Sequence, residues 1–318
     1  MAVDNFVWAV ASVAAPLAAS YIASCFSWRL YYLFTTICVF IVMVVGLAIT
    51  EPRQKIHQKE MVAKPWTMVL FVCAAIVVNL VSYVPFYKGV GLFFISAAFI
   101  ALAIRLERQN THGLFPRRAF FLMSDMGKIV PILFFIALCD PAFNVIGVLY
   151  LVNKLGFALA AISLLFVIKA FVVSISGWIN IVFHAKERTL FWAVAVFTAG
   201  TLLLAISIFL KDYKLIALAI AVEGFGYEIV WLRGSECIVS YAGKGERATA
   251  SIAPIILVRI GYACGAGFSC LLAGGVAFAN HKLGRDMRDS PVFLAVFLVL
   301  LIPFLISWWL LTSKSAVA

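Results

Sequence analysis

Long runs of consecutive apolar residues constrain the fold of this chain more than any other feature of its sequence. Ten runs are found, at 6–26, 30–50, 66–86, 90–104, 129–151, 157–183, 189–210, 215–232, 249–272 and 292–312. An α-helix needs about 20 apolar residues to cross the hydrocarbon core of a bilayer. The runs lack the period-two alternation of barrel strands. The sequence therefore predicts an all-α polytopic membrane protein with about ten transmembrane helices.

Composition excludes the common classes of soluble protein. Of the 318 residues, 65% are hydrophobic and 12% are charged, whereas soluble domains are about 45–50% apolar and about 25% charged. A water-soluble domain this apolar would have to expose large apolar patches. The net charge of +11 is then typical of basic loops at an anionic membrane face. We expect the lipid bilayer as a partner and no nucleic acid.

The basic residues also predict an orientation. Fifteen of the 25 Lys and Arg residues lie in loops on one side of the predicted spans, and eight lie on the other side. Cytoplasmic loops carry the excess of basic residues, so both termini are expected in the cytoplasm. We expect the membrane to be a bacterial inner (plasma) membrane. The fourth run, 90–104, is short, and we expect a tight turn at 87–89 to join it to the third run in a helical hairpin.

Two polar stretches, 51–65 and 105–128, suggest boundaries. They divide the chain into two helices at 1–50, a linker, hairpin and second linker at 51–128, and a block of six helices at 129–318.

Five charged residues lie inside the predicted spans: Asp140, Lys169, Glu223, Glu228 and Arg259. Charges in a bilayer are costly and usually face a cavity or a partner. At 1.5 Å per helical residue, Asp140 and Lys169 both lie roughly 17 Å from the external surface, and Glu223 and Arg259 both lie roughly 14 Å from the cytoplasmic one. Matched depth on consecutive helices predicts two ion pairs, Asp140–Lys169 and Glu223–Arg259.

These charges allow two interpretations. In the first, they line a hydrated cavity whose carboxylates bind protons or a cationic substrate. In the second, they are buried ion pairs that only hold helices together. Polar neighbours accompany two of them, because Asn144 follows Asp140 by one turn and Ser176 and Asn180 share a helical face with Lys169.

Proline and small residues mark positions of bending or close packing. Pro141 follows Asp140 in mid-span, where it either forms a hinge or bends the helix. Pro16 lies in an Ala-rich stretch of the first span. Gly261 and Gly265 form a Gly-x-x-x-Gly pattern that lets helix backbones approach closely, and packing within the chain is a simpler use of it than dimerisation.

Signatures of enzymes and cofactor sites are not found. The four histidines lie in loops or at span edges without the spacing of metal ligands. The sequence has no Gly-x-Ser-x-Gly nucleophile motif and no phosphate-binding Gly-rich motif. We expect a protein that is not an enzyme and that binds no metal or cofactor.

Four stretches carry a resemblance to a known family. They are Ala15-Pro16-Leu17-Ala18-Ala19-Ser20 with Ser27-Trp28-Arg29, then Thr50-Glu51-Pro52-Arg53, then 105–120 with Leu114-Phe115-Pro116-Arg117-Arg118, and finally Gly224-Phe225-Gly226 with 245–251 and Arg259. Together they resemble the fourteen-span drug:proton antiporters of the major facilitator superfamily. Ala15, Ala19 and Ser20 stand where that family usually has glycines.

The resemblance implies two six-helix bundles that flank a hairpin. The second bundle is whole here, whereas the first has two helices, because the family's first four helices have no counterpart. It also implies proton-coupled efflux of small, amphipathic or drug-like molecules, with Asp140 and Glu223 on helices that line a central cavity. Two alternatives stay open. The chain is a truncated transporter, or one half of a split transporter that needs a separate chain for the missing helices, and on this alternative it has no transport activity on its own. Otherwise, it is an unrelated multi-spanning membrane enzyme or channel.

Overall fold

The computed structural model describes residues 10–11, 14–15, 17–22, 25–49, 65–109, 113–121, 124–153, 155–182, 189–243, 245–282 and 305. All regular structure in these ranges is helical. The elements are α2 (Trp28–Ile49), α3 (Pro65–Asn79), η1 (Leu80–Tyr83), α4 (Phe86–Gln109), α5 (Asp125–Pro141), η2 (Ala142–Gly147), α6 (Val148–Asn153), α7 (Leu159–Val182), α8 (Thr189–Leu210), α9 (Tyr213–Ser240) and α10 (Arg247–Lys282). The predicted span at 6–26 is described only in part. The span at 292–312, apart from 305, and the predicted packing residue Pro16 lie outside the described residues.

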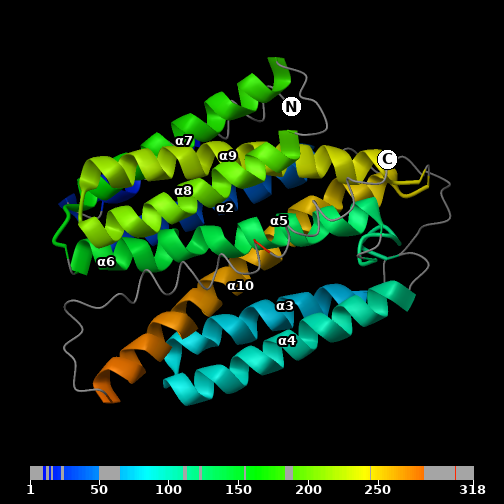
Figure 1. The fold of residues 1–318 in the computed structure, drawn as a ribbon, viewed down its shortest axis with the longest axis horizontal. Coiled ribbons are helices and arrows are strands. Elements are labelled where there is room, and N and C mark those ends of the chain that lie inside the picture. The colour runs from blue at the N-terminus through cyan, green and yellow to red at the C-terminus, as the bar shows by residue number, and fades with distance from the viewer. Residues whose placement is uncertain are drawn as a thin grey trace.

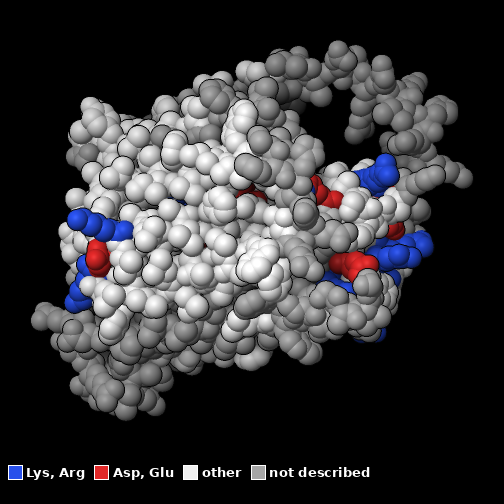
Figure 2. Space-filling model, turned by 45° about the horizontal axis from the view of Figure 1, so that its top comes forward, with Lys and Arg blue, Asp and Glu red and all other residues white. Residues whose placement is uncertain are grey.

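Six described segments are long and apolar enough to cross a membrane. They are Trp66–Tyr83, Phe86–Gln109, Leu159–Asn180, Thr189–Leu210, Tyr213–Ser240 and Arg247–Gly275, and they coincide with six of the ten predicted runs. Charged side chains gather toward the two ends of the molecule's long axis, and uncharged side chains cover most of the face between them (Figure 2). An all-α, multi-pass integral membrane protein follows from this arrangement.

The hairpin of α3 and α4 differs in detail from the prediction. The predicted turn at 87–89 is wrong, because these residues lie in the first turn of α4 and the chain reverses earlier, through η1 and Pro85. Proline lacks an N–H and cannot continue a helix, but its fixed φ suits the start of the next one. The helix is therefore 24 residues long rather than short. Ser96 on α4 donates to the carbonyl oxygen of Ala74 on α3 at 2.8 Å, which joins the two arms.

The predicted span at 129–151 is helical but not uniform. Its first part is α5, which contains Pro131 and Pro141. A π-helical segment, η2, begins directly after Pro141, and α6 completes the span. Proline cannot donate the backbone hydrogen bond that a regular helix needs at this position. Such π segments inside α-helices frequently occur at functional sites.

Helix α10 lies between two groups of helices (Figure 1). On one side it packs against the α3–α4 hairpin, and on the other against α5 and α9. Asn79 at the end of α3 donates to the carbonyl oxygen of Ala263 on α10 at 3.3 Å. Helices α8 and α9 form the most extensive helix pair, and α7 packs on the other side of α9. Helix α2 packs against none of the other described helices.

Glycines set the closest helix contacts. A Cβ atom on Gly265 of α10 would overlap the carbonyl oxygen of Leu138 on α5. One on Gly261 would lie 2.7 Å from the Cβ of Ala137 and 2.8 Å from the carbonyl oxygen of Phe134. The Gly-x-x-x-Gly pattern therefore faces α5 of the same chain, where small residues allow backbone-to-backbone packing.

Candidate functional site

A buried carboxylate, Asp140, lies near the end of α5, and three other helical segments supply its partners. The side-chain amide of Asn144, on η2, donates to Asp140 Oδ2 at 2.7 Å. The hydroxyl of Tyr262, on α10, donates to the same oxygen. The ammonium of Lys169, on α7, donates to Oδ1. The Asp140 side chain is only 1% exposed, so these groups replace the water that a carboxylate otherwise requires.

A second buried carboxylate shares the same lysine. Glu223 on α9 places Oε2 3.0 Å from Lys169 Nζ, and its side chain is 5% exposed. The contact is an ion pair without hydrogen-bond geometry at Oε2. The ring of Tyr227, one turn further along α9, lies 6.0 Å from the same ammonium, which is close enough for a cation–π interaction. We name Asp140, Asn144, Lys169, Glu223, Tyr227 and Tyr262 the charge cluster.

Small residues bring the helices of the cluster together. Gly261 and Gly265 allow α10 to approach α5, so that Tyr262 between them reaches Asp140. A Cβ on Gly224 would lie 3.3 Å from Cγ of Lys169, so this glycine leaves room for the lysine's methylene chain beside α9. On the other face of α9, a Cβ on Gly200 of α8 would overlap the backbone nitrogen of Glu223. Close helix packing thus positions both carboxylates.

The predicted pair Glu223–Arg259 is wrong, because Glu223 lies against Lys169 instead. Arg259 is exposed, on the side of α10 that also exposes Ile252 and Ile255. Depth along a helix, which suggested the pair, does not determine the direction in which a side chain points. The other predicted ion pair, Asp140–Lys169, is present.

The remaining predicted residues lie outside the charge cluster. Glu228 is half-buried, and its position five residues after Glu223 turns it to a different face of α9. Ser176 is buried and donates to the carbonyl oxygen of Val173 on its own helix. Asn180 accepts a 2.8 Å hydrogen bond from Nε of Arg233. Arg233 also contacts Glu236 at 2.7 Å, so a separate polar contact joins α7 to the end of α9.

Sequence reasoning did not single out Tyr262 and Tyr227. One feature of the sequence could have pointed to Tyr262. Its hydroxyl can form hydrogen bonds, and it follows a glycine in a helix expected to pack closely on a neighbour. Tyr227 is placed one turn after Glu223, where a residue shares the helical face of the carboxylate. Both signals depend on knowing which helices are neighbours.

The balance of charge in the cluster decides what it can do chemically. Two carboxylates face one ammonium, so the fully ionised cluster carries one net negative charge. An uncompensated charge in an apolar interior costs several kcal/mol, about 3–5 when a buried pair loses one partner. One additional positive charge, from a proton or a cationic group, makes the cluster neutral.

The charge cluster lies where the helix changes from α to π geometry, at the α5–η2 junction. Pro141 follows Asp140 directly, and Asn144 lies within the π segment. A helix that changes between π and α geometry rotates its side chains relative to one another. Such a change would move Asn144 relative to Asp140.

Comparison with protein-family models and with curated proteins finds no match to this chain.

Proposed function

We propose that the protein is a secondary active transporter that exports small, amphipathic or drug-like molecules in exchange for protons. The observation that carries this proposal is the position of Lys169 between two buried carboxylates, Asp140 and Glu223. A structural ion pair needs one acid and one base, whereas this arrangement has a second acid. The excess negative charge gives a transporter a group that a proton can neutralise.

Exchange follows from competition for that charge. A proton on Asp140 or Glu223 neutralises the cluster, and so does a cationic group of a substrate. Because adding both would leave one net positive charge in an apolar environment, binding of one opposes binding of the other. A protein in which proton and substrate compete for one site, and which opens to each side of the membrane in turn, is an antiporter.

Two further features support the proposal. The cluster joins α5, α7, α9 and α10, so a change in its charge acts on four helical segments at once. The resemblance of the sequence to drug:proton antiporters points to the same function, as does its prediction that Asp140 and Glu223 face a central cavity.

The proposal is tested by transport in proteoliposomes that contain the purified chain and a cationic fluorescent substrate. We expect uptake driven by a pH gradient, and we expect Asp140→Asn and Glu223→Gln to reduce it to the rate of empty liposomes. The matched control is Glu236→Gln, which removes an exposed carboxylate that pairs with Arg233, and its transport should stay within about twofold of wild type because exposed pairs contribute little. Wild-type transport by both cluster variants would exclude the proposal.

A further inference from the structure

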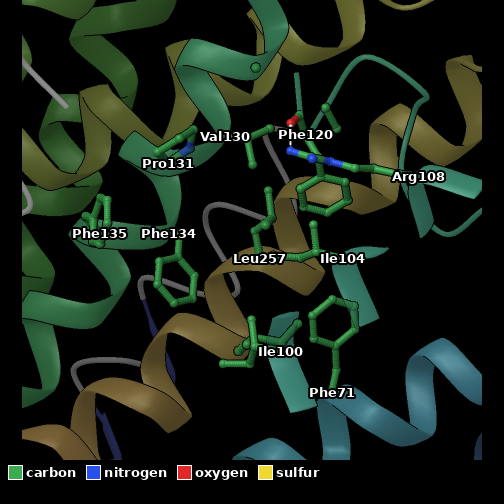
Figure 3. A pocket seen from close by; sticks show the side chains of 13 residues that line it. Phe71, Ile100, Ile104, Arg108, Phe120, Val130, Pro131, Phe134, Phe135 and Leu257 are labelled. Atoms are coloured by element: carbon green, nitrogen blue, oxygen red, sulfur yellow. Dashed lines mark hydrogen bonds between the residues drawn. The ribbon is translucent and has the colours of Figure 1, made fainter. Parts of the chain in front are cut away.

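An apolar pocket of about 250 Å³ lies among α3, α4, α5, α10 and the segment at 119–120, and it shares no lining residue with the charge cluster. Its lining is apolar except for one side chain, Arg108 of α4 (Figure 3). Pockets for drug-sized molecules usually measure about 300–1,000 Å³, so this one suits a narrower ligand.

The pocket has a charged end and an apolar end. Ile100, Ile104 and Arg108 line it from successive turns of α4, which places the Cα atom of Arg108 about 12 Å along the helix from that of Ile100. Figure 3 shows the guanidinium of Arg108 at one end of the lining and the side chains of Ile100 and Phe71 at the other. One leaflet of a bilayer contributes about 15 Å of hydrocarbon, half of a core about 30 Å thick. The lining therefore runs from an apolar end to a charged end over a helix rise comparable with the depth of one leaflet.

The Arg108 side chain is held in place but keeps donors available. Its Nη2 donates to the carbonyl oxygen of Phe120 at 2.6 Å, and its Cζ lies 5.6 Å from the centre of the Phe121 ring. This hydrogen bond uses one of the five N–H donors of a guanidinium. Arg108 is exposed, so the other donors can reach an anion at the surface. Planar N–H pairs of arginine match the oxygens of a phosphate group.

The surrounding charge favours an anionic ligand. Residues 105–128 contain five basic residues and two acidic ones. Of the acids, Glu107 is buried and accepts from the backbone N–H of Phe115, and Asp125 pairs with Lys128. Basic pockets between transmembrane helices bind the headgroups of anionic lipids.

We propose that this pocket binds one anionic phospholipid, with its phosphate on Arg108 and one acyl chain along Ile104 and Ile100. Access is possible because Ile100, Ile104, Pro131, Phe134 and Phe135 are only half-buried. An acyl chain gains little by leaving other lipid for an apolar pocket, since lipid tails are as apolar as the lining. The preference of the pocket for one lipid over another therefore depends on the headgroup. The bound lipid joins the α3–α4 hairpin to α5 and α10, and this inference does not depend on transport.

Native mass spectrometry of the full chain tests the proposal. The protein is released from micelles that contain equal amounts of phosphatidylglycerol and phosphatidylcholine with identical acyl chains. We expect wild type to retain one phosphatidylglycerol in preference to phosphatidylcholine. Arg108→Gln should lower the retained phosphatidylglycerol by roughly tenfold, as expected for loss of a charged hydrogen bond, and Arg108→Lys should restore part of it.

Two matched controls separate the pocket from general surface charge. Arg105→Gln removes an equal charge one turn away on α4, and it should change retention by less than about threefold because Arg105 does not line the pocket. Ile104→Trp fills the pocket without altering charge and should abolish retention, whereas Leu102→Trp on the exposed side of α4 should not. An excess of inorganic phosphate should not displace the lipid.

Several results would overturn the proposal. These are equal losses for Arg108→Gln and Arg105→Gln, equal retention of the two lipids by wild type, unchanged retention in Ile104→Trp, or displacement by inorganic phosphate. Each variant is first compared with wild type in thermal unfolding. If Arg108→Gln does not fold, the comparison of Ile104→Trp with Leu102→Trp, together with the two-lipid competition, still decides the outcome.

Discussion

The ammonium of Lys169 lies 3.0 Å from Oε2 of Glu223, and the same ammonium donates a hydrogen bond to Asp140. One cation from α7 therefore compensates carboxylates on α9 and α5. Changing Asp140 and Lys169 together, which would neutralise an isolated pair, leaves Glu223 buried without its cation. The three residues act as a unit, and their substitutions are expected to be non-additive.

The first prediction concerns this unit. Lys169→Met should destabilise the protein by about 3–5 kcal/mol, because it leaves two buried carboxylates facing each other without a cation. The triple variant Lys169→Met/Asp140→Asn/Glu223→Gln should recover much of that loss. Thermal unfolding in detergent, followed by tryptophan fluorescence, measures both. Lys128→Met is the matched control, and should cost at most about 1 kcal/mol because its partner Asp125 is largely exposed. A triple variant no more stable than Lys169→Met would contradict the prediction.

The second prediction compares two tyrosines. Tyr262 donates to the carboxylate of Asp140, whereas Tyr213 donates to the neutral carbonyl oxygen of Ala161 at 3.1 Å. A hydrogen bond to a charged group contributes about 1.5–3 kcal/mol, and one between neutral groups about 0.5–1.5. Tyr262→Phe should therefore lower the unfolding midpoint more than Tyr213→Phe does. Equal shifts would show that Asp140 does not depend on the Tyr262 hydroxyl.

The third prediction concerns the contact between α10 and α5. Gly265→Ala places a methyl group against the backbone of Leu138, so it should destabilise the protein by about 1–3 kcal/mol. Gly91→Ala on α4 is the matched control, since nothing lies within 4 Å of its added Cβ. That variant should be neutral or up to about 1 kcal/mol more stable, because alanine favours a helix more than glycine does. Similar unfolding midpoints for the two variants would contradict the close approach.

The fourth prediction concerns topology. The positive-inside rule assigns the end of the molecule that carries Arg117 to the cytoplasm and the end that carries Lys88 to the outside. In a background without native cysteines, Lys88→Cys should react with a membrane-impermeant thiol reagent in intact cells. Arg117→Cys should react only after the membrane is permeabilised. Labelling of Arg117→Cys in intact cells would reverse the orientation.

The class of the protein and the approximate positions of six long apolar helices can be read from the apolar runs of its sequence. The length of an apolar run predicts a membrane-spanning helix without knowledge of its neighbours. The reason is that a helix satisfies its own backbone hydrogen bonds and needs only about 20 apolar residues to cross a bilayer. The same reasoning singled out Asp140, Lys169 and Glu223, since a charge within an apolar run is visible without a structure. It did not detect that α4 begins at Phe86, because the reversal depends on η1 and on Pro85.

Which charges meet depends on how the helices pack. Counting residues places a side chain at a depth along its helix, but the rotation of each helix about its axis depends on packing against neighbours. The glycines of α10 bring Tyr262 to Asp140, and packing of α7 on α9 turns Lys169 toward Glu223. Packing also leaves Arg259 exposed. The pocket at Arg108 also depends on tertiary packing, because α10 completes a lining that otherwise comes from residues 71–135.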